Sequence, residues 1–386
     1  MCKESARQCR PELADVVRLH GTGYLSTHAA SAAARRALNA IEICRTSALG
    51  GHLEQCDRCG TSRAVYHSCR NRSCPKCQTL AKERWIEARK AELLPVPYFH
   101  VVFTLPHELN ALARSHARAI YDLLFSAAAE TLLTFGRDPK HLGGMVGVTA
   151  VLHTWGQNLS QHVHVHCVVT GGALACNEAR WIRGRPRFLF PVRALSRVFR
   201  AKYLEGLRRA AAEEVIVPVD KVARIADHLR RAPWVVYAKQ PFAGPEGVIA
   251  YLGRYTHRIA ISNERLLEVT DDYVRFRWRD YRDHNRTKVM TLAPYEFLAR
   301  FVRHVLPRGY VRIRYFGLLA NRCRRQHLQA CRLALAVPIV HAAKKSNLSA
   351  SDLLRRLTGV DIEQCPACRQ GRMRVVGRIE RTARPP

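Results

Sequence analysis

A strict alternation of apolar and polar residues singles out residues 161–169. Apolar side chains occupy every second position from 163 to 169, and three histidines stand between or beside them. A β-strand projects successive side chains to opposite faces. The segment is therefore predicted to be a strand that packs one face on a core. Its other face presents His162, His164 and His166.

Weaker patterns along the rest of the chain predict a mixture of helices and strands. Helices are expected over 1–40, 82–94, 111–135 and 248–256, and strands over 99–105, 145–153, 234–239, 259–262 and 273–278. Because these elements do not alternate regularly as βαβ units, they indicate an α+β fold. We expect three parts, which cover residues 1–90, 91–300 and 301–386.

Three imidazoles in a row on a rigid strand are suited to binding a metal ion. A lone buried histidine is usually just a core residue. Protonated rings stacked on one face would repel each other, so a row of three favours neutral or metal-bound rings. Tetrahedral zinc and an open site for a catalytic divalent ion both fit these ligands.

Cysteines are concentrated near the N-terminus, where six of the 14 fall between Cys44 and Cys77. Two Cys-x2-Cys knuckles, separated by 14 residues, predict a closed structural zinc site with four thiolate ligands: Cys56, Cys59, Cys74 and Cys77. The remaining candidates could hold a second zinc ion or form a core of reduced thiols: Cys44, His52, His67 and Cys69.

A further Cys-x2-Cys pair, Cys365 and Cys368, stands near the C-terminus. It is half of a metal site. Candidates to complete it share one face of a predicted helix: Cys323, His327 and Cys331.

The charge of the chain predicts a polyanionic partner. Lys and Arg number 63 against 31 Asp and Glu, which gives a formal charge of +32 and favours nucleic acid over an anionic membrane surface. The segment 300–332 has nine arginines and no acidic residue, so Arg312 and Arg314 are candidate phosphate contacts, with aromatic residues nearby that could stack on bases. No apolar run appears long enough to span a bilayer and no secretory signal is evident. We therefore expect a cytoplasmic protein.

Several motifs, taken together, resemble the IS91-family transposases, which are rolling-circle enzymes of the HUH nuclease type. The resemblance rests on the cysteine block with CRTSALGGH and SCRNRSCPKCQ, and on four later segments in the family's order: YFHVVFTLPHEL, LHTWGQNLSQHVHVHCVVTGGAL, YLGRYTHRIAISNERLL and RIRYFGLLANR. It implies an N-terminal zinc-binding domain, then an RRM-like antiparallel sheet in which the histidine strand is central, then a basic C-terminal region.

The resemblance also implies the parts of a metal-dependent nuclease. His164 and His166 would be the core ligands of Mg²⁺ or Mn²⁺, with His162 or Gln157 as the third ligand. Tyr251 and Tyr255 are four residues apart, so on a helix both can face the same ion. Three basic residues could neutralise the phosphate near the tyrosines: Lys239, Arg254 and Arg258.

The implied function is nicking and rejoining of single-stranded DNA at element ends and target through a 5′-phosphotyrosine. It would place the protein on the bacterial nucleoid. Because the chain has no GxxxxGK[ST] motor motif, strand separation would come from a host helicase, replication or supercoiling. Two alternatives are a plasmid relaxase or replication initiator of the same chemistry, and a non-catalytic zinc-containing DNA-binding protein.

Overall fold

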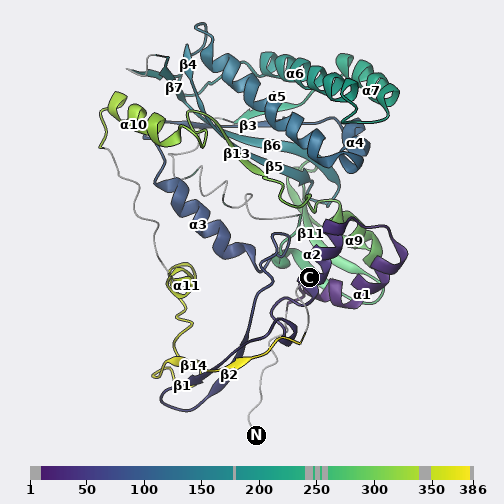
Figure 1. The fold of residues 1–386 in the computed structure, drawn as a ribbon, viewed down its shortest axis with the longest axis vertical. Helices are drawn as coiled ribbons and strands as arrows, with labels where there is room; N and C mark the ends of the chain where they lie inside the picture. The colour runs from purple at the N-terminus through teal and green to yellow at the C-terminus, as the bar shows by residue number, and fades with distance from the viewer. Residues whose placement is uncertain are drawn as a thin grey trace.

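The computed structural model describes residues 10–176, 180–239, 247, 253, 260–338 and 349–382. Its centre is a five-stranded antiparallel sheet (Figure 1). The strand order across this sheet is β13 (Ile313–Gly317), β5 (Gly147–Trp155), β6 (Gln161–Thr170), β3 (Tyr98–Thr104) and β9 (Val236–Lys239). The histidine strand is β6, and it occupies the middle position, so the expected α+β fold with a central histidine strand is confirmed.

Four helices cover one face of this sheet (Figure 1). They are α4 (Asn110–Ser115), α5 (Ala117–Arg137), α6 (Val192–Ala212) and α7 (Val219–Arg231). The apolar side chains of β6 point into this layer, where Val165 and Cys167 are fully buried among aromatic residues such as Phe103 and Phe199. Burial of this face, at about 25 cal/mol per Å² of apolar surface, fixes which side of β6 carries the histidines.

Helix α5 is the part of the structure that bears on the expectation about membranes. Among the described residues it is the one helix that is long and apolar enough, by length and composition, to cross a bilayer. Its apolar residues, including Leu124 and Leu132, are buried against the sheet and α6. The helix is therefore a buried core helix of this domain.

The opposite face of the sheet is partly covered by α3 (Gln78–Lys90) and α10 (Arg324–Ala334). Val151 and Val168 pack there against Leu328 and Cys331 of α10. The histidines lie on this same face, nearer the other end of β5 and β6. A small sheet extends the β6 end of the domain: β4 (Gly144–Met145), β7 (Gly172–Ala175) and β8 (Trp181–Arg183).

A second hydrophobic core joins the start of the chain to residues from its second half. Helices α1 (Leu13–Thr27), α2 (Ala32–Glu42) and α9 (Pro294–Val302) pack on the sheet β10 (Leu266–Val269), β11 (Val274–Asp280) and β12 (Arg286–Leu292). The strand expected over 259–262 is not a strand at 260–262, and residue 259 lies outside the described ranges.

The C-terminal region is shared between two parts of the molecule. Strand β13 is an edge of the central sheet, whereas β14 (Met373–Ile379) pairs with β1 (Gly51–Cys56), which pairs in turn with β2 (Ser62–Tyr66). Helix α11 (Ala350–Thr358) precedes β14. Residues 301–386, grouped as one region from the sequence, therefore complete two separate sheets, because backbone pairing brings distant strands together.

Candidate metal centres

Three histidines from two neighbouring strands converge on one point of the central sheet. His164 and His166 come from β6, and His153 of β5 stands directly opposite His164 in the strand register. One ring nitrogen from each of the three lies within 4.8 Å of the others. All three side chains are buried. This trio is the candidate catalytic metal centre.

The two β6 histidines approach each other through their Nε2 atoms, which are 3.0 Å apart. Two nitrogens that each lie about 2.1 Å from one ion, at a right angle, stand about 3.0 Å apart. The donor set therefore fits a divalent ion held by His164, His166 and His153.

Contacts on the far side of each ring orient these nitrogens. The Nδ1–H of His164 donates to the carbonyl of His162 at 2.8 Å. Nδ1 of His166 lies 2.8 Å from Nε2 of His100, and the two rings are stacked. Ligating histidines usually use the second ring nitrogen in this way, which fixes the tautomer. His100 is thus a positioning residue of the metal centre that the sequence pattern did not single out.

Burial keeps the imidazoles in the neutral form that binds metal. Burial lowers the pKa of His164 to about 3 and that of His100 to about 4. Burial, together with the neighbouring His153 and His164, holds the pKa of His166 well below its usual range. At neutral pH the rings therefore offer lone pairs to a metal without first releasing protons.

The structure brings His153 to His164 and His166, and neither of the candidates for the third ligand named from the sequence. His162 is exposed at the start of β6, outside the converging trio. The side chain of Gln157 donates to the hydroxyl of Tyr281 at 3.1 Å. His153 lies in the trio because the antiparallel register of β5 and β6 places it beside His164. The alternation over 145–153 could have placed His153 on one face of its strand. Its neighbour on the next strand, however, is set by how the two strands pair in the folded protein.

The four residues expected around the phosphate on the tyrosine segment lie outside the described residues: Tyr251, Arg254, Tyr255 and Arg258. Gly253, between the two tyrosines, is described and buried, and a Cβ there would collide with the side chain of Ile86 in α3. The glycine permits close packing on α3. Lys239 is exposed on β9 opposite His100, on the histidine face of the sheet.

Arg312 and Arg314 have structural contacts instead of a free position on the surface. Arg314 is ion-paired with Asp122, and its guanidinium lies 4.4 Å from the ring centre of Phe125. Arg312 is buried, which lowers its pKa to about 9. The aromatic residues expected to stack on bases are engaged too: Tyr310 is buried, and the hydroxyl of Tyr315 accepts from Trp85 and Arg89. Some arginines of the 300–332 segment therefore stabilise the fold through contacts inside the chain.

The cysteines form two clusters, and the combination of knuckles predicted from spacing is wrong. Cys74 and Cys77 join Cys44 and Cys69. The sulfur–sulfur distances recorded in this cluster are 3.6–3.7 Å. Sulfurs that each lie about 2.3 Å from a tetrahedral zinc ion are about 3.8 Å apart. Among the leftover residues, Cys44 and Cys69 are therefore ligands, but with Cys74 and Cys77 as their partners.

The other knuckle, Cys56 and Cys59, joins the C-terminal pair Cys365 and Cys368. Cys56 Sγ lies 3.7 Å from Cys368 Sγ, and Cys59 Sγ lies the same distance from Cys365 Sγ. His52 belongs to neither cluster and contacts Glu54 at 3.1 Å. Of the residues suggested to complete the C-terminal pair, His327 and Cys331 belong to α10 and Cys323 directly precedes it; Cys331 is buried against the central sheet.

Backbone hydrogen bonds close each of the two knuckles of this second cluster. The amides of Cys56 and Cys365 donate to carbonyls five and six residues later, at Thr61 and Gly371. Amides of Arg58 and Gly371 donate to Cys56 Sγ and Cys368 Sγ at 3.4 and 3.3 Å. Backbone N–H groups that point at sulfur favour the thiolate, which is the form that binds zinc.

Comparison with known proteins agrees with this assignment of parts. A family model described as "Transposase zinc-binding domain" matches residues 16–105, and one described as "Putative transposase" matches residues 147–327. The chain is 49% identical over 388 residues to "Putative transposase y4qJ" of Sinorhizobium fredii, with 97% of each chain covered. It is 29% identical over 336 residues to "Transposase for insertion sequence element IS801" of Pseudomonas savastanoi pv. phaseolicola, covering 84% of this chain and 79% of the relative. No solved structure matches.

Proposed function

Because this chain belongs to the IS91 family of transposases, we propose that it nicks and rejoins single-stranded DNA through a 5′-phosphotyrosine intermediate. The observation that carries the proposal is the convergence of His153, His164 and His166 on the central sheet, with their ligand nitrogens within 4.8 Å. Three protein ligands leave coordination positions open for substrate, as a catalytic ion requires.

In the proposed reaction a tyrosine oxygen of Tyr251 or Tyr255 attacks the scissile phosphorus. The bond between phosphorus and the 3′ oxygen breaks, and the phenolic proton is passed to the departing oxygen, which leaves as a 3′-OH. A Mg²⁺ or Mn²⁺ ion, when bound by the three histidines, polarises the phosphate and stabilises the negative charge on that oxygen. Lys239, exposed on the same face as the histidines, supplies a positive charge for the phosphate backbone.

Rejoining is the reverse step. A 3′-OH attacks the phosphotyrosine, and the tyrosine oxygen leaves with a proton. Because the covalent link conserves the energy of the cleaved bond, no nucleotide cofactor is needed. Two tyrosines allow one to hold a strand while the other attacks the next. DNA at the element ends and at the target is the expected partner, and the net charge of +32 supports a polyanionic substrate.

A suicide-substrate assay tests the proposal. Purified protein is mixed with single-stranded oligonucleotides from the element ends and Mn²⁺ or Mg²⁺, and covalent adducts are resolved on a denaturing gel. We expect an adduct that disappears with EDTA and in the Tyr251→Phe/Tyr255→Phe variant. The control Tyr66→Phe/Tyr295→Phe removes two hydroxyls from surface tyrosines and should retain the adduct. An adduct that survives in the Tyr251/Tyr255 variant would refute the assigned nucleophiles.

A further inference from the structure

A basic cavity lies where the N-terminal helices, the first cysteine cluster and the segment after α9 meet. Its volume is about 770 Å³. Its walls come from α2, from residues 67–73 between two zinc knuckle segments, from residues 305–309 and from Arg381 after β14. Pockets of about 300–1,000 Å³ are typical of ligand sites, so the cavity has room for more than one phosphate group.

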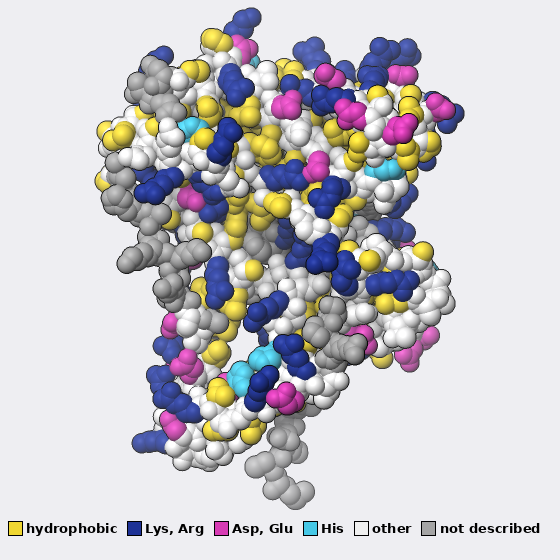
Figure 2. Space-filling view, viewed as in Figure 1, with side chains coloured by type: hydrophobic (Ala, Val, Ile, Leu, Met, Phe, Trp, Pro, Cys, Tyr) yellow, Lys and Arg dark blue, Asp and Glu magenta, His cyan; other side chains and the backbone are white. Residues whose placement is uncertain are grey.

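The lining of the cavity is strongly cationic. Five arginines and no acidic residue contribute to it. Four of the arginines are exposed and make no ion pair among the residues that the structure describes: Arg36, Arg70, Arg308 and Arg381. Figure 2 shows Lys and Arg side chains spread over the whole visible face, with fewer Asp and Glu. Uncompensated guanidinium groups around one hollow favour an anion that accepts several hydrogen bonds.

Arg72, the fifth arginine of the lining, donates its hydrogen bonds to backbone carbonyls. Arg72 donates to the carbonyls of Tyr310 and Pro307 at 2.6 and 2.7 Å. It therefore ties the 67–73 segment to the 305–309 segment and holds the two walls of the cavity together.

The two cysteine clusters hold these side chains in place. Cys69 and Cys74 are ligands of the first cluster and bracket the segment from Arg70 to Ser73. Arg70 adopts a left-handed backbone with φ of 53°. Arg381 follows β14, which begins next to the second cluster, where Met373 pairs with Cys56, and ends where Ile379 pairs with Gly51. Metal binding at both clusters is therefore expected to assemble the cavity.

A short series of contacts connects the cavity with the histidine centre. His153 stacks on Trp155 at 4.5 Å, and Trp155 lies 6.2 Å from the ring of His304. His304 directly precedes Val305 and Leu306 in the cavity wall. The cavity wall and the histidine centre are therefore joined by buried packing.

From these observations we infer that the cavity binds the phosphodiester backbone of single-stranded DNA, through the guanidinium groups of Arg36, Arg70, Arg308 and Arg381. The inference rests on the proposed function for the kind of substrate. It adds a DNA-anchoring site built by the zinc-binding part of the chain, separate from the histidines and tyrosines that carry the chemistry.

The test measures binding without cleavage. A fluorescent single-stranded oligonucleotide is titrated with full-length zinc-loaded protein in Ca²⁺ buffer with the Tyr251→Phe/Tyr255→Phe background, at several salt concentrations. The result therefore does not depend on whether those tyrosines are nucleophiles. We expect Arg36→Gln/Arg70→Gln/Arg308→Gln/Arg381→Gln to lower affinity at least tenfold. The slope of log K against log salt should become shallower by up to about 3, since each phosphate contact on a single strand contributes about 0.7.

A matched variant separates the cavity from overall charge. Arg137→Gln/Arg193→Gln/Arg197→Gln/Arg224→Gln removes four exposed arginines from α5, α6 and α7, which cover the opposite face of the central sheet. Its affinity should fall less than threefold. If both quadruple variants lose affinity equally, or if the cavity variant binds as tightly as its parent with an unchanged salt slope, the inference is overturned.

Discussion

Cys59 Sγ and Cys365 Sγ lie 3.7 Å apart although 306 positions separate them in the chain. Together with Cys56 and Cys368 they form a four-thiolate cluster that fastens the C-terminal segment to the N-terminal sheet. Gly371 passes so close to Cys56 Sγ that a Cβ at this position would collide with the sulfur. One candidate metal site therefore joins the segment around Cys365 and Cys368 to the N-terminal sheet.

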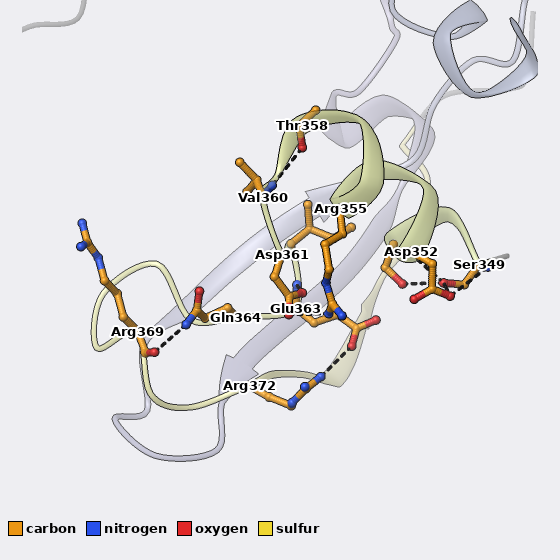
Figure 3. Close-up of polar contacts among 12 residues, drawn as sticks. Ser349, Asp352, Arg355, Thr358, Val360, Asp361, Glu363, Gln364, Arg369 and Arg372 are labelled. Atoms are coloured by element: carbon orange, nitrogen blue, oxygen red, sulfur yellow. Dashed lines mark hydrogen bonds and ion pairs between the residues drawn. The ribbon is translucent and has the colours of Figure 1, made fainter. Parts of the chain in front are cut away.

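The segment that leads into this cluster is held by its own polar contacts (Figure 3). Ser349 and Asp352 form a capping box at the start of α11. Arg355 pairs with Asp361, and Arg372 pairs with Glu363 at 3.1 Å. Exposed pairs of this kind contribute little to stability, because water and salt screen them, so the cysteine cluster and the β1–β14 pairing are expected to provide most of the attachment.

The first prediction concerns zinc stoichiometry. Wild-type protein should contain two zinc ions per chain by elemental mass spectrometry, and Cys365→Ser/Cys368→Ser should contain one, because each cluster uses four different cysteines. The variant should also become sensitive to proteolysis after α10. Cys176→Ser/Cys323→Ser, which alters two cysteines outside both clusters, should keep two ions. Two ions in the Cys365/Cys368 variant would contradict the arrangement.

The second prediction concerns the histidine centre. His153→Ala should weaken Mn²⁺ binding to the zinc-loaded protein by at least tenfold in calorimetry, because a ligand is lost. His162→Ala should change the affinity less than threefold, since His162 offers its carbonyl to His164 and not its ring to the ion. His100→Ala, which removes the partner of His166, should cost about 10- to 100-fold. A larger loss for His162→Ala than for His153→Ala would reverse the ligand assignment.

The third prediction concerns acid stability through a histidine outside the metal centre. His304 is buried; its Nε2–H donates to the Leu159 carbonyl at 3.1 Å, and its Nδ1 accepts from the Thr154 hydroxyl at 3.2 Å. Burial lowers its pKa to about 4, below the 6.5 of an exposed imidazole. The unfolded chain therefore binds a proton more readily between pH 6.5 and 4, and stability falls as pH decreases through this window.

A variant measures this contribution. His304→Gln should be less stable than wild type at pH 7.5, but the difference in unfolding free energy should shrink by about 2 kcal/mol by pH 5, because only the wild type loses the histidine contribution. Urea titrations at both pH values supply the comparison. A difference that stays constant across this range would show that His304 titrates normally in the folded protein.

The fourth prediction separates structural arginines from DNA-binding ones. Arg314→Gln removes an ion pair with Asp122 and two contacts with aromatic rings, Phe125 and Tyr310. It should lower the unfolding free energy by about 1–2 kcal/mol and leave the salt slope of DNA binding unchanged. Arg322→Gln, an exposed change in the same arginine-rich segment, should alter stability by less than about 0.5 kcal/mol. A shallower salt slope for Arg314→Gln would restore its role as a phosphate contact.

The local pattern of apolar and polar residues was sufficient to predict several strands and the direction of their side chains. Alternation over 161–169 defined β6, its buried face and its histidine face, because side-chain direction in a strand depends only on position along it. The fold class and the middle place of β6 agreed with the family resemblance. The predicted bounds of β3, β5 and β9 agree with the observed bounds within a few residues, because buried apolar runs end at turns.

The spacing of residues in the sequence could not show which distant residues come together in one site. The sequence alone determined that this protein has histidines aligned on one strand, Cys-x2-Cys knuckles able to bind zinc and a large positive charge. Only the tertiary structure placed His153 beside His164 and His166, brought Cys56 and Cys59 together with Cys365 and Cys368, and gave Arg312 and Arg314 their buried and ion-paired positions. The physical reason is that a knuckle or a strand face fixes what a ligand can bind, whereas strand register and core packing fix which remote residue reaches it.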